Sequence, residues 1–472
     1  CVGSVRADGN ILSGKGVIVG VIDTGIDIFD NAFRNSDGTT RILNIYDQTT
    51  GEKYDKQSID EYIRLNEDLS GGTFSYDNAP GVDNIMHGTD VSYIAAGSLG
   101  VAYEADIIAV KMGYSINNQF PRTTSLMDAI DYIIRKAIEY RKPVAVNISY
   151  GCNYGAHNGN TLLESFIDDI SKSYRCVICV GSGNEADKAI HFGGIINTGQ
   201  VQTAYLSVGE YQSAIDIQIW KNYWDTIDVM LINPRGEQIG IITEGRINRY
   251  ETYNTEIITL LGEPSPYNIY QEIYINLIPK TDYILSGIWQ IVLMAGSIRA
   301  GEYNIWLPSS QALGYATAFN NPTADGTITI PATARNCIAV GAYNAYTNSY
   351  AAFSGRGFDN SIRNVNAGVK PDITAPGVDI SIARQRGNDI TYRNVTGTSY
   401  AVPVVTGAAA LLMQWGIVMG NDRFMYGEKL KAALIDGSKP VGLVGITRND
   451  NQPDPRTGWG AVCLKNTLNK IL

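Results

Sequence analysis

Short apolar runs that end in polar turns recur along the chain. Residues 17–22, 143–148 and 176–180 are almost continuously apolar, and each run is only five or six residues long. Runs of this length and continuity predict strands buried on both faces of a parallel sheet. Apolar residues at helical spacing follow His87 and Ser399, so helices are expected there. The pattern predicts an α/β fold built on a doubly wound, mostly parallel sheet.

This alternation of helices and strands is interrupted between residues 200 and 308. Apolar and polar residues alternate there with a period of two in several short runs: residues 214–220, 226–232, 257–261, 273–278 and 287–293. Regularly spaced alternating strands predict an inserted antiparallel β-sandwich of the jelly-roll kind. The expected segments are a first part of the core, the sandwich insert and a second part of the core, at residues 1–198, 199–325 and 326–472.

An acid, a base and a nucleophile stand where these elements begin or end. Asp23 directly follows the apolar run at residues 17–22, at the strand end where open α/β sheets place their working groups. His87 and Ser399 each open a stretch with helical spacing. A serine hydroxyl needs a positioned imidazole to act as a nucleophile, and a carboxylate fixes the tautomer of that imidazole. The chain order Asp, His, Ser is one of three known for this geometry, so the sequence predicts a serine protease.

A fourth polar residue completes the predicted machinery. Asn184 follows the apolar run at residues 176–180, and an amide at that strand end can donate a hydrogen bond to a developing oxyanion. The helix that begins at Ser399 offers free N–H groups and the positive end of its dipole for the same purpose. Ordinary structural roles remain as alternatives: a turn-capping Asp23, a structural His87 and an N-capping Ser399. The occurrence of all these motifs in one chain favours catalysis.

Together these motifs resemble those of the subtilisin-like serine proteases, or subtilases. The likeness covers residues 13–198 and 326–472 and includes the Lys-Pro-Asp-Ile-Thr-Ala-Pro-Gly sequence at residues 370–377. It implies a catalytic triad of Asp23, His87 and Ser399, with Asn184 in the oxyanion hole. It also implies that the substrate cleft is lined by Ser149, Tyr150, Gly151, Gly181, Ser182, Gly183 and Glu185. At the mouth of this cleft Glu185 either favours a basic side chain or is merely solvated.

A subtilase core with a β-insert at this place resembles the Csp germination proteases of clostridial spores, and residues 149–159 add to the likeness. Members of that group cleave the precursor of a cortex-degrading hydrolase, which implies a bacterial, spore-associated, autoprocessed protein. One alternative is a general subtilase, secreted or at the cell surface. Another is a pseudoprotease that binds or signals, although the intact triad positions favour an enzyme. We expect the insert to rigidify the core; docking or oligomer formation is the alternative.

Two departures from the subtilase pattern lie near His87. The family often has a second histidine where this chain has Asp90, and residues 95–102 lack the calcium-binding loop that well-known secreted members insert there. We therefore expect no metal requirement in catalysis and no cofactor.

Subtilases cut off their own inhibitory pro-domain, so the cleaved pro-domain is an expected partner besides a peptide or protein substrate. The chain begins at Cys1, close to the Asp23 strand, and no signal peptide or pro-domain is visible in it.

Composition narrows the partners further. The net charge of −10 and the pI of about 5.0 argue against nucleic acid as a target. No apolar run approaches the ~18 residues of a transmembrane helix, so no membrane span is expected. Six cysteines are too sparse for a disulfide framework. Cys176 and Cys179 form a C-x-x-C sequence, but on a buried strand they point to opposite faces, which predicts core thiols rather than a zinc or redox pair.

Overall fold

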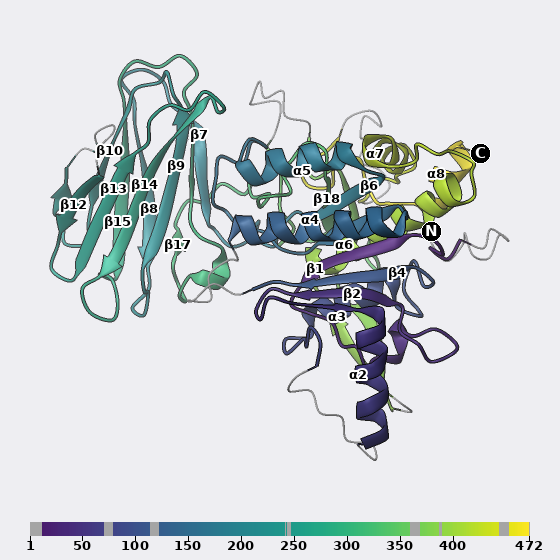
Figure 1. Cartoon of the computed structure of the whole chain (residues 1–472). Helices are drawn as coiled ribbons and strands as arrows, with labels where there is room; N and C mark the ends of the chain where they lie inside the picture. Colours follow the sequence, from purple (N-terminus) through teal and green to yellow (C-terminus); the bar gives the residue numbers. More distant parts are fainter. Residues whose placement is uncertain are drawn as a thin grey trace. The chain divides into compact units, whose positions relative to one another are not determined.

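The computed structural model describes residues 12–69, 79–113, 122–240, 242, 247–358, 369–386, 389–442 and 453–471 (Figure 1). Cys1, at which the chain begins, lies outside these residues. The chain divides into two compact units. The first unit comprises Cys1–Gly151, Leu162–Asn184 and Pro331–Leu472, and the second comprises Cys152–Thr161 and Glu185–Ile330.

A mostly parallel sheet forms the centre of the first unit. Among the described residues it has nine strands in the order β19-β18-β6-β5-β1-β4-β2-β3, with β20 also paired to β18. All neighbouring pairs are parallel except β2 with β3 and β18 with β19. The strands are β1 Ile18–Asp23, β2 Ile42–Asp47, β3 Glu52–Asp55, β4 Asp106–Lys111, β5 Val144–Ile148, β6 Cys176–Gly181, β18 Ile338–Asn344, β19 Ser349–Tyr350 and β20 Ile373–Pro376.

Helices cover both faces of this sheet. Every residue of β1 is buried, because Val19 and Val21 join the hydrophobic cluster on the side of α3 and α6 while Gly20 faces α4. A Cβ atom on Gly20 would lie only 2.7 Å from Ile133 of α4. This two-sided burial confirms the predicted doubly wound α/β fold. The helices are η1 Asn31–Phe33, α2 Lys56–Leu69, α3 His87–Ala96, α4 Thr123–Tyr140, α5 Leu162–Ser173, α6 Thr398–Met413, the π-helix η3 Gln414–Val418, α7 Gly427–Asp436 and α8 Leu464–Ile471.

The second unit is an antiparallel β-sandwich. Its sheets have the orders β11-β10-β15-β8-β17 and β12-β13-β14-β9-β16-β7. Buried residues alternate along the strands, and those of both sheets, such as Ile217 and Ile291, share one hydrophobic cluster. The predicted antiparallel insert is thereby confirmed. Its elements are β7 His191–Ile195, β8 Val201–Val208, β9 Ile215–Asn222, β10 Ile227–Ile232, β11 Gln238–Ile239, β12 Ile247–Glu251, β13 Thr255–Leu261, β14 Tyr270–Pro279, β15 Gly287–Ala295, β16 Glu302–Trp306, η2 Ser310–Ala312 and β17 Ala318–Phe319.

The second unit is larger than the segment 199–325 expected from the sequence. Strand β7, placed in the core by the sequence pattern, pairs with β16 instead. Residues 152–161 also belong to this unit: the Gly155 N–H donates to Gln218 (2.8 Å), and the His157 ring bonds the Ile328 carbonyl (2.6 Å). Both features come from pairing with distant strands, which local hydrophobic patterns do not report.

One apolar helix and the cysteines bear on other sequence expectations. In the described part of the chain, one helical stretch, Thr398–Val418, has the length and hydropathy of a membrane span, and most of it is buried in the protein. It is α6 with its π-helical continuation, and its burial fits the core helix predicted behind Ser399. Cys176 and Cys179 are free and buried, as predicted for core thiols, whereas Cys463 is disulfide-bonded.

Candidate active site

The predicted acid and base meet at the edge of the sheet. Asp23 is the last residue of β1 and His87 is the first residue of α3, and His87 Nδ1 lies 2.6 Å from Asp23 Oδ1. The carboxylate is almost fully buried, and the backbone N–H of Thr24 donates to the same oxygen (2.8 Å). Because a carboxylate can only accept, we assign the proton to Nδ1. Nε2 of His87 is then the nitrogen that can take a proton from a nucleophile.

Gly88 permits this close approach of helix and strand. A Cβ atom at Gly88 would lie 2.3 Å from the Gly25 carbonyl oxygen and 3.0 Å from the Asp23 Cβ. Any other residue would therefore push α3 away from β1. The Gly88 N–H also donates to the Thr24 hydroxyl (2.9 Å), which fixes the first turn of α3 to the end of the strand. The Gly that follows His87 thus serves the geometry of the acid–base pair.

Opposing influences act on the pKa of His87. Burial is the largest and lowers the pKa, because it disfavours the imidazolium. The charge and hydrogen bond of Asp23, assisted by the charge of Asp83, raise it and prevail, so that the net pKa lies above its ordinary value. The charge of Arg393 partly opposes this increase. The surroundings of His87 therefore stabilise the imidazolium that would form when the base takes a proton.

Ser399 lies in the first turn of α6, and a proline shapes its environment. Pro403 has no N–H, so the Ser399 carbonyl lacks the helical donor that position i+4 normally supplies. The Ser149 hydroxyl donates to this carbonyl instead (3.1 Å). Asn147 in turn donates to Ser149 (3.0 Å) and accepts from Thr406 of α6 (3.1 Å). The end of β5 thereby holds the start of the helix that carries the serine.

The Asn184 amide is oriented by the same helix start. Its Oδ1 accepts hydrogen bonds from the Thr398 N–H (2.9 Å) and the Thr398 hydroxyl (3.0 Å). With Oδ1 occupied, Nδ2 is the end of the amide available for donation, and it lies near the backbone just before Ser399: a Cβ atom on Gly397 would be 3.5 Å from it. This is the orientation that an oxyanion donor requires.

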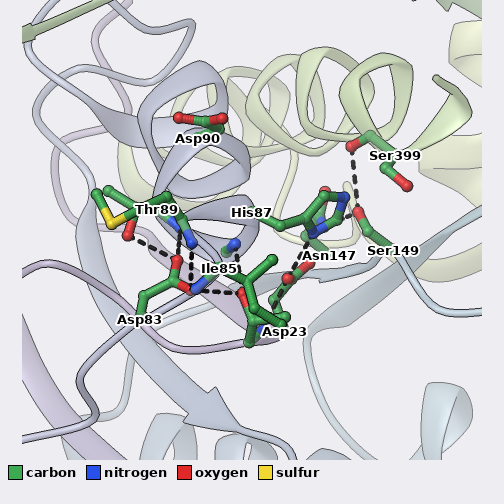
Figure 2. Close-up of polar contacts among 12 residues, drawn as sticks. Asp23, Asp83, Ile85, His87, Thr89, Asp90, Asn147, Ser149 and Ser399 are labelled. Carbon is green, nitrogen blue, oxygen red and sulfur yellow. Dashed lines mark hydrogen bonds and ion pairs between the residues drawn. The ribbon is translucent and has the colours of Figure 1, made fainter. Parts of the chain in front are cut away.

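Figure 2 shows the His87 ring lying between Asp23 and Ser399. The ring also contacts Tyr400, the neighbour of the serine, with a centroid separation of 5.4 Å. Among the described residues, Ser399 Oγ makes no hydrogen bond to His87. Catalytic hydrogen bonds of this kind often tighten only when substrate is bound. The structure therefore brings the acid and the base into bonding contact and the serine to the same rim.

The other predicted cleft residues occupy three kinds of position. Ser149, Tyr150 and Gly151 follow β5 and are half-buried. Ser182 is fully buried, with its hydroxyl 3.3 Å from that of Ser354, so its side chain serves the interior. The remaining residues of the predicted set are Gly181 at the end of β6, Gly183 beyond it, and Glu185.

Glu185 is neither exposed nor free. It belongs to the second compact unit and is buried there, and the Ser310 N–H (3.1 Å) and hydroxyl (3.3 Å) donate to its two carboxylate oxygens. Burial raises the pKa of this carboxyl above its ordinary value. A preference for basic substrate residues at Glu185 would have to compete with these bonds, and it stays a prediction.

The sequence analysis did not identify Asp83, which organises the start of α3. Its buried Oδ1 accepts from the Thr24 hydroxyl (2.8 Å) and from the backbone N–H groups of Ile85 (3.2 Å) and Met86 (2.7 Å). Its Oδ2 accepts from the N–H and the hydroxyl of Thr89, both at 2.8 Å (Figure 2). A carboxylate four residues before a predicted helix start is a capping signal that could have revealed this role.

A second missed feature surrounds Asp90. This carboxylate is fully buried on α3 and pairs with two arginines, Arg384 and Arg393. The arginines lie on the hairpin of β21 (Ile380–Arg386) and β22 (Asp389–Val395). Because Arg384 is 294 residues from Asp90, no local signal could have predicted the contact.

The chain is similar in sequence and in structure to several known proteins. The sequence model of the subtilase family matches residues 14–265 and 300–460. The solved structure of the Clostridium perfringens CspB protease aligns with 100% of this chain and 96% of its own, with a TM-score of 0.89 and 34% identity. The subtilase-type proteinase RRT12 of Saccharomyces cerevisiae is 33% identical over 128 residues, 26% of this chain and 23% of that protein. Subtilisin E of Bacillus subtilis is 38% identical over 107 residues, 22% of this chain and 24% of that protein. The matched stretches span about a quarter of these two relatives.

Proposed function

The chain belongs to the subtilase family, a family of serine endopeptidases, and we propose that Asp23, His87 and Ser399 carry its reaction. The observation that supports this most is the 2.6 Å contact between Asp23 and His87, two residues 64 positions apart. A buried carboxylate and an imidazole in this relation are the orienting half of a triad. Ser399 on the first turn of α6 supplies the nucleophile.

The reaction follows from these positions. Nε2 of His87 takes the Ser399 proton as the hydroxyl oxygen attacks the peptide carbonyl, and the Asp23 charge stabilises the imidazolium. The carbonyl oxygen becomes an oxyanion that accepts hydrogen bonds from Asn184 Nδ2 and from the backbone N–H of Ser399. The imidazolium then protonates the leaving amine, and water hydrolyses the acyl-enzyme by the same steps in reverse order.

The same proposal extends to the substrate. The likeness to the CspB protease extends over the whole chain, including the sandwich insert. We propose that this chain acts by limited proteolysis and that its substrate is the precursor of a spore cortex hydrolase. The cleft walls would be the segment Ser149, Tyr150 and Gly151, which can pair with an extended peptide, and the Gly181–Gly183 turn.

Replacing the nucleophile tests the triad. We expect Ser399→Ala to abolish peptide hydrolysis and covalent labelling by a fluorophosphonate, because it removes the hydroxyl from which His87 is proposed to take the proton. Ser173→Ala is the matched control, since Ser173 ends α5 and its hydroxyl bonds only the Ile170 carbonyl in the described structure. Labelling of Ser399→Ala at the level of this control would exclude Ser399 as the nucleophile.

Asn184→Ala separates oxyanion binding from nucleophile activation. Removal of a comparable amide donor costs about 10²–10³ in turnover, a value known from a subtilisin rather than derived for this chain. We expect a loss of that order in kcat with a much smaller change in KM, because the bond forms mainly in the transition state.

For the substrate, incubation with a purified cortex hydrolase precursor should give one defined cleavage that Ser399→Ala does not produce. A precursor left intact by an enzyme that labels normally would refute the substrate and leave the triad standing.

A further inference from the structure

We propose that Arg384 and Arg393, by sharing the buried carboxylate of Asp90, form a clamp that positions the His87 end of α3 beside Ser399. This inference rests on the proposed roles of His87 and Ser399. The three residues Asp90, Arg384 and Arg393 are called the Asp90 clamp below. None of them is assigned contact with the substrate, so they act as positioning residues.

The clamp satisfies a carboxylate that would otherwise be unfavourable. Asp90 has no exposed surface, and a buried charge is tolerated only when it is paired and hydrogen-bonded. Arg384 Nε lies 2.9 Å from Oδ1, its Nη2 pairs with the same oxygen, and Arg393 Nη2 pairs with Oδ2. Each carboxylate oxygen therefore has its own guanidinium. The Arg384 side chain is 14% exposed and that of Arg393 is 41% exposed, so solvent screens the second pair more than the first.

The hairpin that carries the arginines connects the base to the nucleophile. Arg384 Nη2 also donates to the carbonyl of Met86 (3.0 Å), the residue immediately before His87. Met86 has a φ of 66°, in the left-handed region, so an external bond at this point helps to define the direction in which α3 begins. Strand β22 ends at Val395, and α6 begins at Thr398, next to Ser399. One hairpin thus holds the backbone before the base and continues into the helix of the nucleophile.

The clamp also sets the electrostatic surroundings of His87. The charges that act on the pKa of His87 come from Asp23 of β1, Asp83 before α3 and Arg393 of β22, and the ring of Tyr400 on α6 contacts the His87 ring. Two guanidinium groups share one carboxylate, which leaves an excess positive charge on the hairpin side. The Arg393 charge lowers the pKa of His87, and Asp90 partly neutralises Arg393. Removing the Arg393 charge should therefore raise the pKa of His87, and removing the Asp90 charge should lower it.

Histidine titration by NMR tests this sign reversal without depending on activity. The chain has three histidines, and the signal of His87 can be assigned by its loss in His87→Gln. In a Ser399→Ala background, which prevents autolysis, we expect Arg393→Gln to raise the pKa of His87, because a charge that lowers it is removed. Arg393→Lys keeps the charge and should leave it unchanged. Asp90→Asn should lower it. Arg135→Gln, an exposed arginine on α4, is the control that should have no effect.

The positioning role has a kinetic readout in the Ser399 enzyme. Asp90→Asn should reduce kcat about tenfold at a pH where His87 is neutral, with KM changed less than twofold, because it misplaces the base without touching the substrate. The clamp proposal would be refuted if the pKa of His87 were the same in all variants. It would also be refuted if Arg393→Gln and Asp90→Asn shifted this pKa in the same direction. If Asp90→Asn does not fold, the Gln and Lys variants of Arg393 decide alone: equal pKa values in the two refute the proposal. Absence of fluorophosphonate labelling in the parent enzyme would instead refute the proposed function. The titration of His87 does not depend on activity, so it distinguishes a failure of the clamp from a failure of the proposed function.

Discussion

Replacing Asp83 by asparagine is the sharpest test of how α3 is held in place. The buried Asp83 carboxylate accepts five hydrogen bonds, three at Oδ1 and two at Oδ2. Asparagine keeps the shape but has one oxygen. With that oxygen in place of Oδ1, the new NH₂ group faces the Thr89 N–H, so two donors oppose each other. The Thr89 hydroxyl can turn and accept from the NH₂ group, which leaves the N–H as the main unsatisfied group.

The expected cost of Asp83→Asn is about 3 kcal/mol of unfolding free energy. A hydrogen bond to a charged acceptor contributes ~1.5–3 kcal/mol and one to a neutral acceptor ~0.5–1.5 kcal/mol, so each of the three retained bonds loses about 1 kcal/mol. The unsatisfied Thr89 N–H adds a further ~1–3 kcal/mol. Burying a neutral amide costs less than burying a carboxylate, and this gain offsets part of the loss. The net estimate of about 3 kcal/mol is a large fraction of the usual stability of a domain.

Urea unfolding in a Ser399→Ala background measures this cost, and hydrogen exchange of the α3 amides locates it. The matched control is Asp169→Asn on α5, an 85% exposed acid for which we expect less than ~0.5 kcal/mol. The active form of Asp83→Asn should also show its acid limb of kcat/KM at lower pH, because the variant lacks a charge that raises the pKa of His87. A stability within ~0.5 kcal/mol of the parent, with unchanged protection of α3, would refute the reasoning.

Two further predictions concern titration. The Asp23 charge and hydrogen bond outweigh burial and hold the pKa of His87 above 6.5. Because the neutral base is lost as pH falls through that raised pKa, the acid limb of kcat/KM should have its midpoint above pH 6.5. A midpoint near pH 6 would contradict this. Burial raises the pKa of Asp30 from 3.8 to about 6, so the folded state binds more protons than the unfolded state between these values, and stability falls as pH rises across this window. Asp30→Asn should remove that fall and be up to about 3 kcal/mol more stable than the parent at pH 7.5; equal urea midpoints for parent and variant at both pH 5 and pH 7.5 would count against it.

The elements that the sequence predicted well are those whose signal is local. The strand at residues 17–22 is fully apolar because both its faces are covered, and it ends at Asp23 as expected. The helix expected after His87 is α3, which begins at His87 itself and ends at Ala96. In the insert, the alternating run at residues 226–232 corresponds to β10, Ile227–Ile232. Periodicity reports which side of an element is covered, and in these cases that information was sufficient.

The contacts that hold the site were not predictable because they join residues far apart in sequence. Asp90 was noted only as a departure near His87, and its partners lie on a hairpin about 290 residues later. The consequence of Pro403, a Ser399 carbonyl that accepts from Ser149, depends on the position of β5. Residues 152–161 carry no strong hydrophobic pattern and join the second unit through hydrogen bonds to its strands and loops.

These long-range contacts imply that the catalytic geometry forms only when the first unit is complete. The base is held by Asp23 from β1 and by Arg384 from the hairpin, and the nucleophile's helix is held by Ser149 from β5. Each support comes from a different segment of the chain, and the hairpin reaches both sides of the site. A change at Asp23 or Arg384 should therefore lower turnover before it alters substrate affinity, because it moves the proposed reacting groups relative to one another while leaving the cleft walls in place.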